Sequence, residues 1–278
     1  MTGHPRTSRT LDIADCPAGV DLLARVRRGL ERRLAGFGNV SVPLRSLAAE
    51  TRALVLEALG EGDIQADIDG SEGHPRTLLR ETAFAGVWYW QRLGPASEVL
   101  DDGLEIGDCP QLMLQCAFQS ASARLEWPPE HDADTLGAVG VLAELAAHLD
   151  AWRRAAWPGG GVSDSLSQPA SGNPQPHCVN LGLMPLTPAD RVLLDRTLGQ
   201  GPVRILNRAY GQCEIEATGV RPIWRVRHFN CDGRRLLDSL EIANLPSAVV
   251  ATAEDLADSD ARLGELCVMI GAAHVFPG

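Results

Sequence analysis

The sequence predicts an α+β fold of two tandem repeats, each a small antiparallel sheet flanked by helices, related by an approximate two-fold axis. Two observations support this prediction. The stretch WYWQRLGPASEVLDDGLEIGDCP at 88–110 is echoed, without a gap, by WRVRHFNCDGRRLLDSLEIANLP at 224–246. The helices and strands expected around the two stretches also follow one another in the same order, which indicates an internal duplication.

The echo lies at an offset of 136 residues (224 − 88) and keeps seven identities in 23 aligned positions. Ordinary composition would give roughly one or two. The identical pairs are Trp88/Trp224, Leu100/Leu236, Asp102/Asp238, Leu104/Leu240, Glu105/Glu241, Ile106/Ile242 and Pro110/Pro246. A small change of offset, to 139, also superposes Leu59-Gly60 on Leu198-Gly199. The shared Trp, Asp and Glu residues are therefore interpreted first as structural residues of the repeated unit.

The first repeat is predicted over residues 21–129, after a loose polar arm at 1–20. Its first two helices are expected at 20–34, where apolar residues recur with a helical period, and between Ser46 as N-cap and Gly60 as C-cap. The elements expected next are strands near 63–69, 77–84, 86–93 and 98–106, and a helix that begins at Pro110.

The two repeats are joined by a predicted connecting helix at 130–157 and a linker at 158–180. The linker is rich in Gly, Pro and Ser, so we expect no regular structure there. The second repeat, at 181–278, then repeats the order of the first. Its expected elements are a helix within 185–201, strands near 202–208, 213–218, 222–229 and 235–243, and a closing helix within 246–267.

The composition argues against several classes of protein. The net charge of −11, from 25 basic and 36 acidic residues, argues against nucleic-acid binding, which needs a basic surface. No stretch has the length and apolarity of a signal peptide or a membrane span. Seven scattered cysteines, an odd number, indicate reduced thiols rather than a disulfide framework. We therefore expect a soluble, cytoplasmic protein without a membrane span.

The sequence predicts no catalytic residue, metal site or cofactor. The G-x-G pieces at 60–62 and 199–201 each end a helix, so they are interpreted as C-caps rather than a dinucleotide site. Asp102 and Asp238 interrupt apolar strand faces. They are either carboxylates placed for chemistry or structural residues that accept backbone N–H bonds at a bulge or sheet edge, and we favour the structural role. No C-x-x-C occurs, and His177-Cys178 is the one adjacent His/Cys pair.

Residues that differ between the two repeats are the better candidates for a partner-binding site. Gly211 could take a positive φ and expose Cys213 at a loop tip, or Cys213 could be buried as a small hydrophobe. Trp224 is either a core anchor or an exposed contact for a partner. The candidate partner-binding residues are Tyr210, Gly211, Cys213, Trp224, His228 and Asn230.

Several motifs of the second repeat occur together over about ninety residues. They are L-G-x-G-x-V at 198–203, Y-G-x-C at 210–213, W-R-V-x-x-F-N at 224–230, L-D-x-L-E-I at 237–242 and E-D-L-A-D-S-x-x-R-L at 254–263. In this order they resemble the C-terminal conserved region of the HupH/HyaF hydrogenase expression/formation proteins. Cys231 departs from that pattern, in which a small hydroxyl residue follows the F-N pair.

The resemblance implies a non-catalytic accessory role in the maturation of a membrane-bound, uptake-type [NiFe] hydrogenase. It implies a cytoplasmic scaffold or chaperone that binds the iron–sulfur small-subunit precursor before twin-arginine export, alongside a thioredoxin-like accessory protein. The alternative is a redox or iron–sulfur transfer factor that acts through Cys213.

Overall fold

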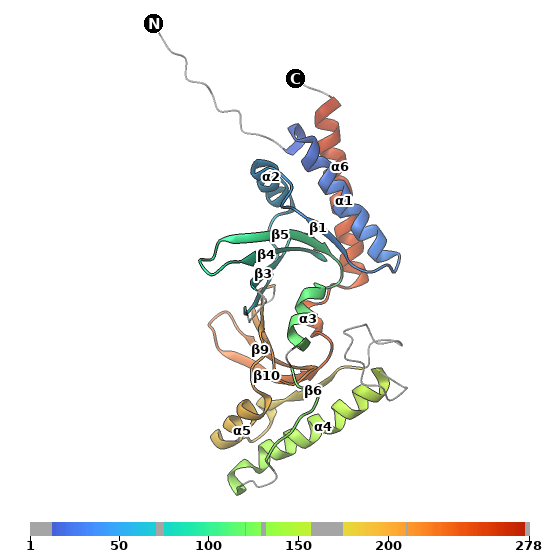
Figure 1. The fold of residues 1–278 in the computed structure, drawn as a ribbon. Helices are drawn as coiled ribbons and strands as arrows, with labels where there is room; N and C mark the ends of the chain where they lie inside the picture. Colours follow the sequence, from blue (N-terminus) through green and yellow to red (C-terminus); the bar gives the residue numbers. More distant parts are fainter. Residues whose placement is uncertain are drawn as a thin grey trace.

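A computed structural model describes residues 13–70, 75–119, 121–128, 132–156, 175–209 and 211–275. Within these ranges the fold is α+β, with six α-helices and one sheet of ten antiparallel strands (Figure 1). The helices are α1 Pro17–Leu34, α2 Ala49–Leu59, α3 Gln111–Gln119, α4 Leu136–Ala156, α5 Pro188–Leu198 and α6 Ala253–Val275. None of these helices is both long and apolar enough to cross a lipid bilayer.

The strands of the sheet lie in the order β1-β5-β4-β3-β2-β7-β8-β9-β10-β6. Every neighbouring pair is antiparallel. Their bounds are β1 Val40–Pro43, β2 Ile64–Ile68, β3 Arg76–Glu81, β4 Val87–Leu93, β5 Val99–Ile106, β6 His177–Asn180, β7 Val203–Asn207, β8 Gln212–Ala217, β9 Ile223–Phe229 and β10 Arg235–Ile242. The eight strands expected from the sequence are confirmed to within two or three residues at each end.

Strands β2 and β7 join the two halves of the chain into one continuous sheet. Ala66 lies opposite Ile205 at the middle of this pair, with Ile64 opposite Asn207 and Ile68 opposite Val203. Adding 139 to 64 and to 68 gives 203 and 207, so the offset that relates the two halves exchanges the ends of this pairing. The sequence predicted a small sheet in each repeat and did not show that the two would share an edge.

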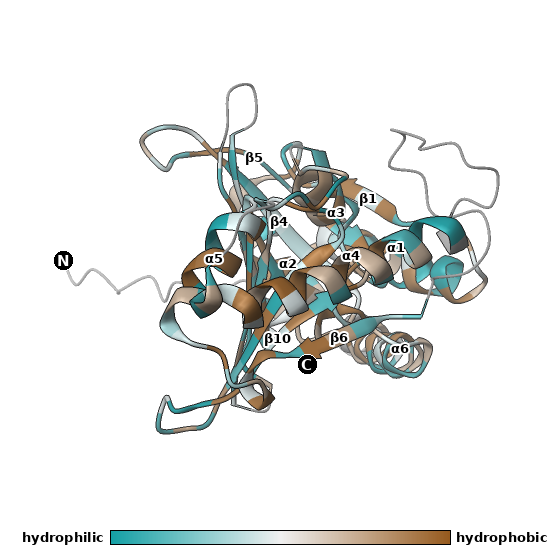
Figure 2. Ribbon diagram, turned by 90° about the horizontal axis from the view of Figure 1, so that it is seen from below, coloured by the Kyte–Doolittle hydropathy of each residue, from teal (hydrophilic) through white to brown (hydrophobic). Residues whose placement is uncertain are grey.

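Three apolar cores hold the layers together. On one face of the sheet, α1, α2 and α6 pack on β1, β4 and β5, while α4 and α5 pack on β6, β9 and β10. The central core lies on the other face and combines residues of both halves with α3 and the segment 245–249. Figure 1 shows α3 between the two halves of the sheet, and Figure 2, seen from below, shows α4 and α5 in the foreground.

Glycine and proline define the helix ends as the sequence predicted in most places. Gly60 and Gly199 cap α2 and α5 with φ of +64° and +62°, the left-handed region that favours glycine. Thr187 begins α5 with a capping box that includes Asp190. The expected N-cap at Ser46 is wrong: α2 begins after Ala48, and no side chain caps it.

The edges of the sheet differ from the sequence prediction. The edge strands β1 and β6 were not expected, and β6 falls in the stretch predicted as an irregular linker. Both have four residues, too short for a periodic pattern, and only pairing with β5 and β10 defines them. Residues 158–174 of that linker lie outside the described residues. In the predicted N-terminal arm, residues 13–15 form a short 3-10 helix and α1 already begins at Pro17.

Candidate functional site

Two neighbouring turns carry part of the predicted partner-binding set. Gly211 lies before β8, is exposed and has φ of +95°. A Cβ at this position would lie 2.8 Å from the carbonyl oxygen of Phe229. Because Gln212 pairs with Phe229, the β7–β8 connection lies beside the turn at 230–234 between β9 and β10. Tyr210 lies outside the described residues.

Asn230 organises the β9–β10 turn. Its Oδ1 accepts hydrogen bonds from the backbone N–H groups of Asp232, at 3.0 Å, and Arg234, at 2.8 Å. Gly233 takes φ of +74°, which completes the turn that the Asn-Cys-Asp-Gly run predicts. Cys231 is exposed at this turn. Much of the hydrogen-bonding capacity of Asn230 is therefore used within the turn.

Cys213 and His228 lie opposite each other on β8 and β9. The Cys213 Sγ is 3.6 Å from Nε2 of His228, and the cysteine is buried in the central core. Burial, and then the nearby carboxylates of Glu241 and Glu214, raise the pKa of the Cys213 thiol to about 11. The sulfur therefore stays a thiol at neutral pH, and a thiol is a poor nucleophile and a poor metal ligand.

Trp224 is a core residue. Its side chain is fully buried, and its indole N–H donates to the carbonyl oxygens of Ala243, at 3.1 Å, and Asn244, at 3.2 Å. The ring also packs against Phe118 of α3, with centroids 6.3 Å apart. Of the two roles considered from the sequence, the burial of Trp224 fits the core anchor, because the side chain belongs to the central core.

The paired aspartates are held by arginines. Asp238 is buried and accepts hydrogen bonds from Nε and Nη2 of Arg225, both at 3.1 Å, with Arg235 also at 3.1 Å. Asp102 is buried in the same way beneath Arg52, at 3.1 Å, and accepts a hydrogen bond from a tyrosine hydroxyl. The role is structural, as favoured, but the partners are guanidinium groups instead of the backbone N–H groups expected.

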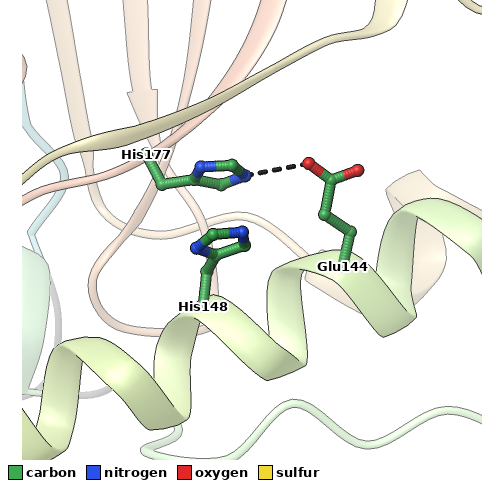
Figure 3. Close-up of side chains that lie close together, drawn as sticks. All are labelled: Glu144, His148 and His177. Carbon is green, nitrogen blue, oxygen red and sulfur yellow. Dashed lines mark hydrogen bonds and ion pairs between the residues drawn. The ribbon is translucent and has the colours of Figure 1, made fainter.

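A different set of side chains comes together where α4 passes the edge strand β6. Glu144 and His148 lie one helical turn apart on α4, and His177 reaches them from β6 (Figure 3). Nε2 of His177 donates to Oε1 of Glu144 at 2.9 Å. The two imidazole rings stack with centroids 3.3 Å apart and an interplanar angle of 9°. One ligand atom from each residue lies within 4.8 Å of the other two.

The comparisons with known proteins agree with the motifs of the second half. The family model described as "HupH hydrogenase expression protein, C-terminal conserved region" matches residues 18–126 and 135–270. The chain belongs to the HupH family. The match covers both halves of this HupH-family chain, from α1 into α6, whereas the motifs seen in the sequence were concentrated in the second half.

Named relatives resemble this HupH-family chain over most of its length. The hydrogenase expression/formation protein HoxQ of Cupriavidus necator is 33% identical over 254 residues, 90% of this chain and 81% of the relative. The hydrogenase-1 operon protein HyaF of Escherichia coli is 31% identical over 274 residues, 98% of this chain and 88% of the relative. A solved structure of the hydrogenase expression protein HupH from Thiobacillus denitrificans is 24% identical and covers 47% of this chain and 94% of its own, with a TM-score of 0.38.

Sequence reasoning missed the Glu144–His148–His177 group of this HupH-family chain. The signal was present in part, because Glu144-x-x-x-His148 has the spacing that places two side chains on one helix face. The third member could not be found, since His177 was assigned to the linker and the strand that aims it at α4 is defined only by pairing with β10.

Proposed function

We propose that this HupH-family chain is a non-catalytic assembly factor for an uptake-type [NiFe] hydrogenase, and that it binds the iron–sulfur small-subunit precursor. The observation that carries the proposal is the 33% identity, over 90% of the chain, with a protein named for hydrogenase expression and formation. Such a precursor is present before export, so the proposed place of action is the cytoplasm. A thioredoxin-like accessory protein is the proposed second partner.

The proposal includes an internal duplication with an approximate two-fold axis through the β2–β7 pair. Three features support it. The strand order is symmetric about this pair, and the pairing register is exchanged by the offset of 139. The family model also matches one region in each half. A duplicated scaffold presents the same kind of hairpin twice, at the β4–β5 and β9–β10 ends.

We place the precursor contact at these hairpin ends and the adjoining turns. Leu236 is 67% exposed on β10 and Leu100 is 46% exposed on β5, at positions related by the offset of 136. Figure 1 shows both hairpins extending to the same side of the molecule. Exposed apolar side chains on hairpins suit contact with the apolar segments of an incompletely folded partner.

Of the residues proposed for this contact from the sequence, Gly211, His228 and Asn230 are at least partly accessible at the turns beside Leu236. Cys213 pairs with His228 and Trp224 lies towards the other end of β9, opposite Ala217, and both belong to the central core. Their proposed contribution is to fix the shape of the surface, and Tyr210 stays a prediction.

The alternative function, redox or iron–sulfur transfer through Cys213, has one observation in its favour. The Sγ of Cys213 lies 3.6 Å from the imidazole of His228, an arrangement that can activate a thiol. Burial and the raised pKa of about 11 oppose it, because the reactive thiolate is scarce at neutral pH. We therefore favour the scaffold.

Crosslinked capture of the small-subunit precursor tests the proposal. The full chain and its Leu236→Arg variant are expressed in hydrogenase-producing cells, crosslinked and isolated. We expect the variant to lose at least about tenfold in captured precursor, since a charge replaces an apolar contact. Val192→Arg on α5 is the matched control, because Val192 is also 67% exposed but lies on a different element.

Two results would count against this assignment. Failure of the unchanged chain to capture the precursor would overturn the proposed function. Equal losses in Leu236→Arg and Val192→Arg would keep the function but remove the hairpin as the contact. Testing Leu100→Arg alone and together with Leu236→Arg then shows whether both halves take part.

A further inference from the structure

We infer that Glu144, His148 and His177 form a binding site for a divalent transition-metal ion, for which zinc is the best match. The inference is independent of the proposed function, since it rests on side chains far from the β9–β10 hairpin in the chain and on the opposite face of the sheet from the central core. It assigns a role to a group that the assembly proposal does not use.

The fold brings the three side chains together for identifiable reasons. Leu142, Leu145 and Leu149 bury one face of α4 in the core against β10, which fixes the rotation of the helix. Glu144 and His148, four residues apart, then share a neighbouring face of α4. His177 lies opposite Ile242 of the same core, so its side chain leaves β6 on the face that α4 covers (Figure 3).

The neighbouring Cys178 is not part of the site. Successive residues of a strand point to opposite faces, and Val179 points into the core beneath α4 and α5. His177 therefore shares the α4 side with Val179, while Cys178 faces the other way, where Ser239 hydrogen-bonds its thiol. The donor set is two imidazoles and one carboxylate.

The distances between the ligand atoms suit an ion that would replace the hydrogen bond between His177 and Glu144. Tetrahedral zinc binds nitrogen and oxygen ligands at about 2.0–2.2 Å, which places neighbouring ligand atoms roughly 3.3–3.5 Å apart. The Nε2–Oε1 distance between His177 and Glu144 is already 2.9 Å. The third ligand atom, from His148, lies within 4.8 Å of both, so binding needs only a rotation of this exposed side chain away from its stack on His177.

The chemistry of the donors selects the class of ion. Two imidazoles favour zinc, copper, nickel or iron(II) over magnesium or calcium, which prefer oxygen ligands. Three protein ligands leave at least one coordination position for water or for a ligand from another molecule. A bound ion would also tie the edge strand β6 to α4, since the ligands come from both elements.

Zinc titration of the chelator-treated, untagged full chain tests this site. We expect one zinc ion per chain by calorimetry, an increase in melting temperature with zinc, and a visible Co²⁺ spectrum of a low-coordinate site. His148→Ala and His177→Ala should each weaken zinc binding by at least the roughly 10–100-fold that loss of a supporting residue costs other metal sites.

Matched controls separate this site from other histidines and thiols. Cys178→Ser changes the next residue of β6 and Asp150→Asn changes a nearby carboxylate on α4, and both should bind zinc as the unchanged chain does. The inference is overturned if the unchanged chain binds no zinc, or if the His148→Ala, His177→Ala double variant binds it equally well. It is also overturned if His177→Ala lowers the melting temperature but zinc never raises it, because the group is then only a hydrogen bond between β6 and α4.

Discussion

Trp88 on β4 and Trp224 on β9 are both fully buried in the central core, yet they differ in how the indole N–H is satisfied. The N–H of Trp224 donates to the carbonyl oxygens of Ala243 and Asn244. The Nε1 of Trp88 is buried without an acceptor in the part of the chain that the structure describes. The two tryptophans match in the sequence echo, yet burying the indole N–H costs more free energy at Trp88 than at Trp224.

The variants Trp88→Phe and Trp224→Phe measure this difference in stability. Both variants lose some packing, but Trp224→Phe also removes an N–H that donates to two carbonyl oxygens, whereas Trp88→Phe removes a buried donor that has no acceptor among the described residues. We expect Trp224→Phe to be the more destabilising by about 1–3 kcal/mol in urea unfolding. Equal losses, or a larger loss for Trp88→Phe, would contradict the difference in hydrogen bonding.

Removing the buried carboxylate of Asp238 should strongly destabilise the second half. Asp238→Asn leaves Arg225 and two further arginines around a buried position without a negative charge. Breaking a buried ion pair of this kind costs about 3–5 kcal/mol in the free energy of unfolding. The control is Asp101→Asn, whose partner Arg92 is 3.8 Å away at the surface, and for which we expect less than about 1 kcal/mol.

Glu81 should make stability fall as pH rises. Burial raises its pKa from 4.5 to about 7, against the hydrogen bond donated by the Gly86 N–H, with Asp255 and Asp63 also raising it. Between pH 4.5 and 7 the folded protein therefore keeps a proton that the unfolded chain has released, so the free energy of unfolding decreases across this window and levels off above it.

The Glu81→Gln variant tests that pH dependence, because glutamine can accept the same N–H bond without a charge. Above pH 7 we expect the variant to be more stable than the unchanged chain, by on the order of 1–3 kcal/mol. Urea unfolding at several pH values measures the difference between the two proteins, which should shrink towards pH 4.5. A difference that does not change with pH would argue against a buried, titrating carboxyl.

The thiols should react in the order of their exposure. A maleimide at pH 7.5 should modify the exposed Cys231 rapidly and Cys213 very slowly, since a pKa of about 11 leaves roughly one Cys213 thiol in three thousand ionised. Mass spectrometry of the modified peptides gives both rates. Rapid modification of Cys213 in the folded chain would instead support the redox alternative.

The sequence predicted local structure well wherever a periodic pattern was long enough. The alternation of residues in the Trp strands, the Asn-Cys-Asp-Gly turn and the glycines after α2 and α5 each led to the element observed. The same reasoning failed for β1 and β6, because a four-residue edge strand is defined by its neighbour rather than by its own pattern. It also failed for Ser46, since α2 begins without a side-chain cap.

Of the candidate site, the sequence indicated which residues were unusual but could not say which were accessible. Cys213 and Trp224 looked as suitable for binding as Gly211 and Asn230, and only packing against the central core separated them. Leu236 was noted as the repeat partner of Leu100, but its exposure could not be predicted, because exposure depends on what covers a strand.

By itself, the sequence determined the α+β class, the order of elements, the repeated hairpin and the resemblance to the HupH family. These depend on side-chain periodicity, turn residues and motifs, which are local properties of the chain. The tertiary structure alone decided that β2 and β7 fuse two halves into one sheet, that arginines hold the buried aspartates, and that His177 meets Glu144 and His148. Apart from Arg235, which is three residues from Asp238, those contacts join residues between 13 and 143 positions apart, and such pairs form only when the packing of whole elements brings them together.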